Sequence, residues 1–186
     1  MIELLTIKKC QKGDQRAFKV LYDTTVAYVF SIVKRYVYDA SLSKDLVQDA
    51  YAQIFTSINN YNEKKGEFKP YLRKITVNVC LMHLRSQKSL PILNAVEDIY
   101  EEPQYDKGHS KIDNLNRKDI EKILINMPEG YKTIFLLHII DEFDYSEIAK
   151  MLGITRETAR SQYFRAKKWI INKSIIDTKS RSYGLF

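Results

Sequence analysis

Apolar residues in this chain recur at steps of three and four, the spacing of one face of an α-helix. No segment sustains the alternation of apolar and polar residues that a half-exposed β-strand shows. The pattern therefore predicts an all-α protein. The clearest stripe follows Gly13 and Asp14, a pair typical of one helix ending and the next being capped. Its members are Phe18, Leu21, Tyr22, Val26, Val29, Phe30 and Val33.

Two further helices are expected in the N-terminal half. One begins near Leu42 and ends at residues 59–62, and its apolar face lies opposite a polar one. The other has Pro70 in its first turn, where the missing N–H of proline costs little, and runs toward Arg85. The polar face of the first of these helices carries Lys44, Asp45, Gln48, Asp49 and Gln53.

A short helix pair with a tight joint is predicted in the C-terminal half, in YSEIAKMLGITRETARSQYFRAKK. We expect the first helix over Ser146–Leu152, because Gly153 favours its end and Thr155 can cap the next helix. Asp144 and Glu147 have the spacing of a capping box for the first helix. This is the pattern of a helix-turn-helix, whose second helix enters the major groove of DNA.

The second helix of this pair is strongly basic, with six Lys and Arg residues and one acid in residues 155–173. A basic helix face alone is most often a solvated surface, and it is the preceding helix and the glycine joint that favour DNA binding. Arg160 can hold a guanine edge through two hydrogen bonds, whereas Lys167 and Lys168 are suited to phosphate contacts. Further donors to bases or phosphates are Ser161 and Gln162.

Charge divides the chain into three parts. Residues 1–90 carry a net charge of +7, residues 91–115 a net charge of −4 and residues 116–186 a net charge of +4. The middle part holds two prolines and a glycine and has no steady apolar period, which is typical of a linker, although a solvated loop has the same composition. We therefore expect two small helical domains joined by a flexible linker. The predicted parts are domain 1–90, linker 91–113 and helix-turn-helix domain 114–186.

Composition limits the class of protein. A hydrophobic content of 45% is enough for a core and excludes wholesale disorder. No apolar run approaches the roughly 18–20 residues of a membrane span, and the N-terminus has no signal-peptide pattern, so we expect a cytoplasmic protein. The two cysteines, Cys10 and Cys80, are too few for a disulfide framework. The formal net charge of +7 favours a polyanionic partner.

The sequence contains few candidates for a catalytic or metal-binding motif. Cys80 and His83 form half of a metal site at most, because no second pair lies at zinc spacing. His138 lies in an apolar run and is expected to pack in the core. No Gly-rich phosphate loop, nucleophile elbow or carboxylate pair stands out. We therefore expect no enzyme, no cofactor, no metal and no small-molecule substrate.

Three stretches, in order along the chain, resemble conserved parts of bacterial extracytoplasmic-function (ECF) sigma factors. SLSKDLVQDAYAQIF is similar to the second-region helix that docks on RNA polymerase, and FKPYLRKITVNVCLMHLR to the segment that melts the promoter. MPEGYKTIFLLHIIDEFDYSEIAKMLGITRETARSQYFRAKKWI is similar to the fourth region. Aromatic and basic character is retained where the chain departs from the family, whereas promoter preference is less transferable. The departures are Met127, Lys132, Tyr71 and Ala159, where the family commonly has Leu, Arg, Trp and Val.

The resemblance implies a sigma factor that binds core RNA polymerase, directs it to specific promoters and assists promoter melting. The core-polymerase contacts that it implies are Asp45, Leu46, Gln48 and Asp49. The implied contacts to the minus-ten element are Tyr71, Arg73, Lys74, Asn78 and Arg85, with Val77 to Met82 as a loop that accepts an extruded base. The implied contacts to the minus-thirty-five element are Arg156, Arg160, Ser161, Gln162, Phe164, Arg165 and Lys168.

Plainer interpretations of two of these sets stay open. The polar stripe that includes Asp45 and Asp49 suits a coiled-coil partner with basic residues, but an ordinary solvated helix face has the same pattern. Tyr71 can stack on a base, and it can equally be an aromatic residue of the core.

Two other functions are also open on the residues alone. A free-standing helix-turn-helix regulator would use the same C-terminal pair, but it has no use for KDLVQDAYAQIF and would need a sensor or dimerisation module. An enzyme acting on nucleic acid would need catalytic residues that the sequence does not offer. Sigma factors of this family are often held by an anti-sigma factor. The expected partners are therefore core RNA polymerase, promoter DNA and an anti-sigma factor. The anti-sigma factor could be a membrane protein.

Overall fold

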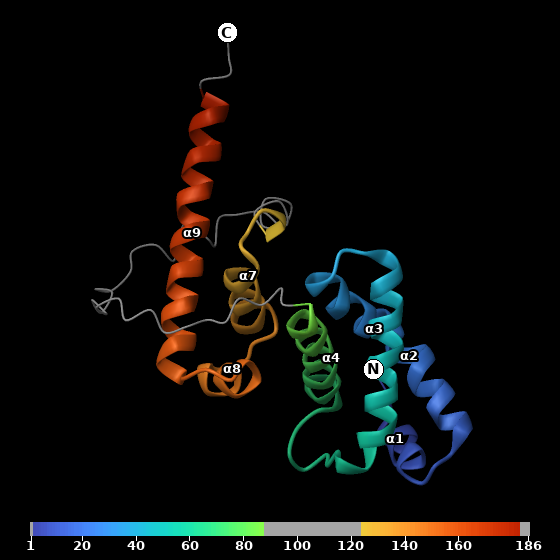
Figure 1. The fold of residues 1–186 in the computed structure, drawn as a ribbon. Coiled ribbons are helices and arrows are strands. Elements are labelled where there is room, and N and C mark those ends of the chain that lie inside the picture. The colour runs from blue at the N-terminus through green and yellow to red at the C-terminus, as the bar shows by residue number, and fades with distance from the viewer. Residues whose placement is uncertain (1, 88–123, 183–186) are drawn as a thin grey trace. The chain divides into compact units, whose positions relative to one another are not determined.

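The computed structural model describes residues 2–87 and 124–182, with residues 174–182 as backbone alone. In these ranges all regular structure is helical, which confirms the all-α prediction. The chain forms two units, Met1–Lys88 and Ser89–Phe186, each with its own contacts. Figure 1 shows the helices of both units. The predicted linker at 91–113 and the predicted domain boundary at residue 114 lie outside the described residues.

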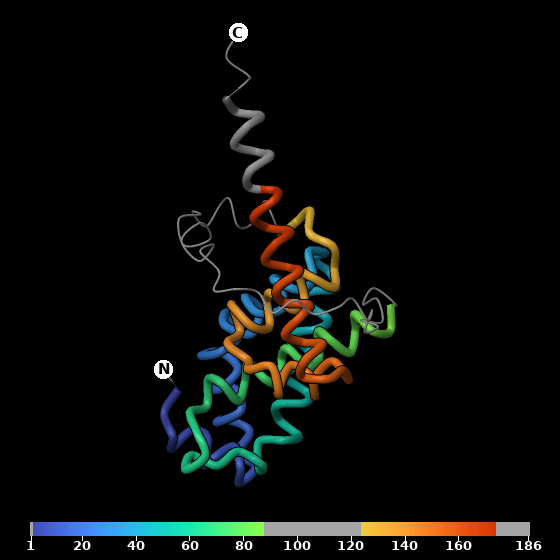
Figure 2. Tube along the Cα trace, turned by 90° about the vertical axis from the view of Figure 1, so that its left-hand side faces the viewer, coloured from blue at the N-terminus to red at the C-terminus, as the bar shows by residue number. Residues whose placement is uncertain are grey.

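The N-terminal unit is built from four α-helices and a short 3₁₀ turn. Helix α2 packs against α1, α3 and α4, and α3 also packs against α4. Figures 1 and 2 show that the loop between η1 and α4 lies beside α1, at the same end of the unit. The elements are α1 (Leu4–Gln11), α2 (Gln15–Tyr36), α3 (Ala40–Ser57), η1 (Ile58–Asn60) and α4 (Phe68–Ser86).

The helix starts in this unit follow from short polar side chains. Asp14 accepts hydrogen bonds from the backbone N–H groups of Arg16 and Ala17, at 2.8 and 3.2 Å. Gly13 before it has φ +81°, a left-handed conformation that glycine adopts without steric cost. Asp39 caps α3 by accepting from the N–H of Leu42 at 2.7 Å. The predicted cap at Asp14 is confirmed, and α3 begins two residues before Leu42.

The core of the N-terminal unit contains one buried polar contact among its apolar side chains. The hydroxyls of Thr25 on α2 and Tyr51 on α3 lie 2.7 Å apart, and both residues are buried. Burial raises the pKa of Tyr51 to about 12, because it disfavours the phenolate. The predicted stripe on α2 is only partly buried, since Tyr22 is 40% exposed, whereas Ile32 is fully buried.

The C-terminal unit contains the predicted helix-turn-helix. Helix α9 packs against α7 and α8, and Figure 1 shows α8 and α9 joined by a tight turn. Between α7 and α8 the chain forms a π-helical turn, η2, and then a connection in which Glu142 has φ 59°. The elements are α7 (Glu129–Phe135), η2 (Leu136–Ile140), α8 (Tyr145–Leu152) and α9 (Arg156–Ser182).

The joint between α8 and α9 has the local chemistry expected from the sequence. The Asp144 carboxylate accepts from the N–H of Glu147 at 2.8 Å, and the Glu147 carboxylate accepts from the N–H of Asp144 at 3.3 Å, which is a capping box. Gly153 ends α8 at φ 69°. The Thr155 hydroxyl accepts from the N–H of Thr158 at 3.0 Å and so caps α9. These predictions are confirmed, and α8 begins one residue before Ser146.

His138 packs against neighbouring rings of the C-terminal unit, but it is half-buried and not enclosed in the core as predicted. Its ring stacks on Tyr145 with centroids 4.4 Å apart and meets the edge of Tyr163 at 4.6 Å. Its Nδ1 lies 3.0 Å from the carbonyl oxygen of Phe143, so the ring fixes the connection that leads into α8.

Candidate polymerase and nucleic-acid interfaces

The outer face of α3 carries three of the four residues implied to contact polymerase. Asp45, Gln48 and Asp49 are exposed, and their spacing of three and four residues places them on one side of the helix. Their exposure leaves this face of the N-terminal unit accessible to a partner protein. The fourth residue, Leu46, is only 3% exposed and packs in the core of the unit. We therefore remove Leu46 from the proposed contact set and assign it to orienting α3.

The outer face of α4 is basic and polar. Lys74 and Arg85 are exposed, and Asn78 lies between them, half-buried, on the same side of the helix. Arg73 is also half-buried. The whole helix contains no Asp or Glu, so this surface can approach phosphate without repulsion from its own acids.

Tyr71 at the start of α4 has a structural role. Its hydroxyl donates to the carbonyl oxygen of Ser57 at 2.6 Å and lies 3.0 Å from the Ser57 hydroxyl. Its ring packs near Phe68 and Tyr61, with centroid distances of 5.7 and 5.3 Å. These contacts favour the interpretation of Tyr71 as an aromatic residue of the fold, with only its half-exposed side left for DNA.

The loop implied at Val77 to Met82 does not exist in the structure. These residues lie inside α4, and Val77, Cys80 and Leu81 are buried in the core. The prediction was wrong because a helical apolar stripe continues through them, with Asn78 and Met82 on the outer side. The longest connection between the described helices of this unit comprises residues 61–67, between η1 and α4.

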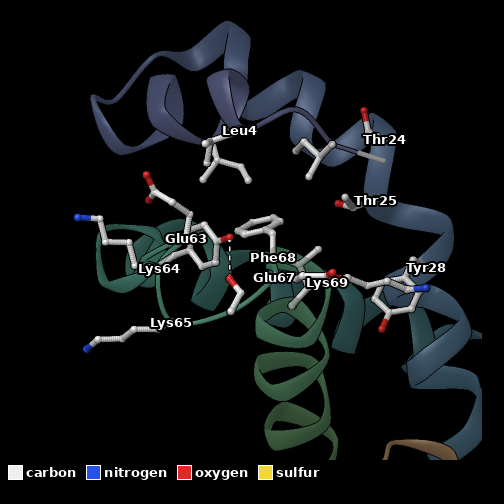
Figure 3. Close-up of a pocket in the computed structure, with 15 residues that line it drawn as sticks. Leu4, Thr24, Thr25, Tyr28, Glu63, Lys64, Lys65, Glu67, Phe68 and Lys69 are labelled. Carbon is white, nitrogen blue, oxygen red and sulfur yellow. Dashed lines mark hydrogen bonds between the residues drawn. The ribbon is translucent and has the colours of Figure 1, made fainter.

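A cavity of about 940 Å³ lies beside that loop. Figure 3 shows the aromatic ring of Phe68 at its centre, with Leu4 of α1 above and Thr24 of α2 to one side. The Lys69 ammonium lies over the Tyr28 ring, 5.0 Å from its centroid. The cavity thus combines aromatic surfaces with a charged rim. The rim residues are Glu63, Lys64, Lys65, Glu67 and Lys69.

The exposed face of α9 is strongly cationic. Arg156, Arg160 and Lys168 are exposed at steps of four and eight residues, so they lie on one side of the helix. The Arg160 guanidinium lies 5.8 Å from the centroid of the Phe164 ring, on the next turn of the same side. The predicted residues Ser161, Phe164 and Arg165 are half-buried at the edges of this face.

Two residues expected to contact DNA lie on the inner side of α9. Gln162 is 5% exposed and Lys167 is 2% exposed, so both side chains are enclosed by the C-terminal unit. Their position follows from the helical period. Gln162 is four residues after the buried Thr158, and Lys167 is eight residues after the buried Ala159. We remove both from the proposed DNA contacts. Tyr163, rather than Phe164, occupies the inner face.

The half metal site suggested by Cys80 and His83 gains no further ligands. Within residues 2–87 and 124–173, no group of three His, Cys, Asp or Glu side chains is arranged to hold a metal ion. Among the helices that the structure describes, none is long and apolar enough to cross a membrane.

Sequence reasoning missed the cavity and the residues of α1 that border it. Gln11 donates to two backbone carbonyls that lie 47 and 50 residues further along the chain, and Lys8 pairs with Glu63. No local pattern in the sequence reports contacts over such a separation. The one local signal was the group of apolar residues in α1, which indicates that this helix packs against the rest of the unit.

Known protein families match both units of the chain. The sigma-70 region 2 domain matches residues 21–90, and the sigma-70 region 4 domain matches residues 117–170. Together they span about two thirds of the chain, in the order of sigma factors. The chain belongs to the sigma-70 family, whose members serve RNA polymerase in transcription initiation.

Curated relatives place the chain within the ECF group of that family. The ECF RNA polymerase sigma-E factor of Haemophilus influenzae is 29% identical over 189 residues, which cover 93% of this chain and 97% of the relative. The sigma-E factor of Escherichia coli K12 is 28% identical over 183 residues, covering 93% and 94% of the two chains. This protein is an ECF sigma factor: it binds core RNA polymerase, directs it to promoters and assists promoter melting.

A solved structure supports the fold. CnrH, in a complex with the cytosolic domain of CnrY, matches with a TM-score of 0.53 at 15% identity, over 94% of this chain and 96% of that one. The matched region 2 also decides against the free-standing regulator, because such a regulator has no use for that domain.

Proposed function

We propose that three helix faces divide the work of this sigma factor. The α3 face with Asp45, Gln48 and Asp49 binds core polymerase, the α4 face with Asn78 binds the minus-ten element, and the α9 face with Arg160 binds the minus-thirty-five element. The observation that carries the proposal is the segregation of charge. The exposed face of α3 carries two acids and one cation, Lys44, whereas α4 has no acid, and α9 has six Lys and Arg in residues 155–173, of which only Lys167 is buried. Acids on α3 suit a basic protein partner, and the other two faces suit DNA.

The cavity beside residues 61–67 is proposed to accept the extruded base of the minus-ten element. Opening a duplex costs about 1.4 kcal/mol per base-pair step in lost stacking. A sigma factor has no ATP to offset that cost, so it must hold unpaired bases, and stacking on an aromatic ring contributes roughly 1–3 kcal/mol per base. The cavity is lined by the rings of Tyr28, Tyr61 and Phe68, the last of them only 6% exposed, and its rim carries three lysines and two glutamates. This replaces the earlier assignment to Val77–Met82.

We further infer that the protein works in the cytoplasm, where core RNA polymerase and the chromosome are located, and that it performs no chemical step of its own. An anti-sigma partner is part of the same proposal. CnrH was solved with the cytosolic domain of CnrY, and a comparable partner for this chain would act by covering the α3 or α9 face.

The test of the polymerase assignment is a double charge reversal. Asp45→Lys with Asp49→Lys places two cations where we expect basic residues of the clamp, so comigration with core polymerase in native gels should be lost, together with promoter-dependent transcripts. The control is Asp23→Lys, which reverses an exposed acid on α2 whose ion pair with Lys19 is largely exposed to solvent. Undiminished comigration of the double variant, with helicity unchanged, would remove α3 from the interface.

A further inference from the structure

Helix α1 lies outside the matched sigma-70 region 2, which begins at residue 21, yet it forms one wall of the cavity. Figure 3 shows the Leu4 side chain pointing down toward Phe68 from the ribbon above. Ile7, one turn further along α1, also lines the cavity and is buried. The wall opposite Phe68 is therefore supplied by a helix with no assigned role.

Helix α1 is also attached to the loop by polar contacts. The Gln11 side-chain amide nitrogen donates to the carbonyl oxygens of Ile58 at 3.0 Å and Tyr61 at 2.9 Å. Ile58 is the first residue of η1 and its carbonyl also accepts from the N–H of Tyr61, whereas Tyr61 directly follows η1, so Gln11 spans the two ends of this turn. Lys8 adds an ion pair to Glu63 at 3.0 Å, but both side chains are largely exposed, so this pair contributes little. Gln11 is the stronger of the two attachments.

The residue held by Gln11 is an aromatic wall of the cavity. The Tyr61 ring meets the edge of Phe68, with centroids 4.9 Å apart. Its hydroxyl donates to the carbonyl oxygen of Gly66 at 3.1 Å, across the loop. Tyr61 is thus fixed at its backbone by Gln11 and at its hydroxyl by the loop itself. Without the Gln11 contacts the Tyr61 ring keeps its packing against Phe68 and Tyr71 of α4, but the backbone at Ile58 and Tyr61 loses its attachment to α1.

We propose that Gln11 is a positioning residue for base recognition: by fixing the backbone at Ile58 and Tyr61, it holds the cavity in the shape that distinguishes one extruded base from another. The inference rests on the proposed function of the cavity as the acceptor of that base. A wall that is already ordered needs no ordering when the base enters, so Gln11 contributes to discrimination by reducing the entropy cost of binding.

The variants separate donation from packing. Gln11→Met keeps the length of the side chain and a good helix former but removes both N–H donors. Lys9→Met is the matched control, because Lys9 is exposed on the same helix and receives the same substitution. Gln11→Lys restores donors on a long side chain and is the rescue variant. Circular dichroism of each variant establishes that the helical fold is retained.

The measurement uses the full chain with core polymerase and forked promoter DNA. The preferred minus-ten sequence is first selected from a pool randomised across that element. Each position is then replaced in turn by the other bases and by an abasic nucleotide, and the affinities are compared. For the parent we expect one position at which the preferred base binds more tightly than the abasic site. We define the base ratio as the affinity for DNA with the preferred base divided by the affinity for DNA with the abasic nucleotide at that position. For Gln11→Met we expect the base ratio to fall by about three- to tenfold, the scale of one or two lost hydrogen bonds, with unchanged affinity for the abasic DNA.

Each outcome decides between distinct conclusions. Lys9→Met should keep the parental ratio, and Gln11→Lys should recover most of it. An equal loss on preferred and abasic DNA means that Gln11 is merely structural and overturns the positioning role. A parental ratio in Gln11→Met overturns it as well, while leaving base capture intact. If the parent itself shows no preference over the abasic nucleotide at any position, the proposed function of the cavity fails and the inference falls with it.

Discussion

The α4 side of the N-terminal unit and the α9 face of the C-terminal unit are both basic, yet they are built differently. Beside α4 there is a cavity with aromatic walls, and its shape depends on a loop held by another helix. On α9 the exposed cations Arg156, Arg160 and Lys168 lie on the outer face of one continuous helix, at steps of four and eight residues. A cavity suits a single unpaired base, whereas a regular convex face suits the major groove of an intact duplex. Under the proposed function, two basic surfaces of different geometry therefore serve two modes of DNA recognition.

The largest effect that tests this comparison is expected at Arg160. Arg160→Ala should weaken binding to the minus-thirty-five duplex by roughly 1–3 kcal/mol and relax base preference there, if the guanidinium holds a guanine edge. Lys168→Ala, from the same face, should weaken all sequences about equally, since a phosphate contact carries no sequence information. Both are measured by affinity for specific and random duplexes. Equal losses on the two kinds of duplex for both variants would assign Arg160 to the backbone.

A smaller effect, of a different kind, is expected at Asn78 on α4. Asn78→Ala should reduce open-complex formation by about fivefold, the scale of one hydrogen bond to an unpaired base, while polymerase binding and duplex binding stay near normal. A premelted promoter bubble should bypass part of the defect, because strand opening then needs no base capture. Permanganate reactivity of unpaired thymines on both templates measures the difference. Parental opening of the matched duplex by the variant would contradict a role for Asn78 in melting.

The third prediction concerns stability and sets the C-terminal unit apart. Glu142 adopts φ 59°, a left-handed conformation that costs a residue with a Cβ about 1 kcal/mol relative to glycine. Glu142→Gly should therefore stabilise this unit by about 0.5–1 kcal/mol. Trp169, the one tryptophan of the chain, lies on α9 and reports on this unit by fluorescence. A lowered unfolding midpoint of the Trp169 signal would show that the Glu142 side chain contributes more than its backbone strain costs.

The smallest effect is a pH dependence confined to the N-terminal unit. The pKa of Tyr51 is raised to about 12 by burial, from an ordinary value near 10 in the unfolded chain. The stabilising contribution of the neutral phenol is therefore complete below pH 10 and is lost as pH rises toward 12. Tyr51→Phe should lose less of its thermal stability between pH 9 and 11 than the exposed control Tyr38→Phe, as followed by far-ultraviolet circular dichroism. Identical slopes for both variants would place the ionisation elsewhere.

Local sequence predicted where several helices begin, but it did not predict correctly which of their side chains are exposed. The caps at Asp14, Asp144 and Thr155 were predictable because each acts on backbone groups two or three residues away. The inward positions of Gln162 and Lys167 were predictable from the helical period as well, but their polar character suggested that they face solvent. Position in the period was the better guide of the two.

The cavity lay beyond any reading of local pattern. Its walls come from α1, α2, the loop at 61–67 and the start of α4, so its existence depends on how these elements pack. The resemblance to sigma factors indicated that a base-accepting loop should exist, but it did not fix the position, and Val77–Met82 proved to be helical. The resemblance thus indicated that an unpaired base is bound, while the packing of the helices determines which surface is available to bind it.

The contact from Gln11 to Tyr61 has a consequence for the order of folding. It closes a segment of 50 residues, whereas α8 and α9 meet across a turn of a few residues. Closing a long segment loses more chain entropy, so this attachment should form after α2, α3 and α4 have assembled. The same reasoning makes it an early point of local opening in the native protein. Backbone amides at the end of η1 should then exchange with heavy water faster than those of α2, so the loop at 61–67 would open on its own timescale while the helices around it stay closed.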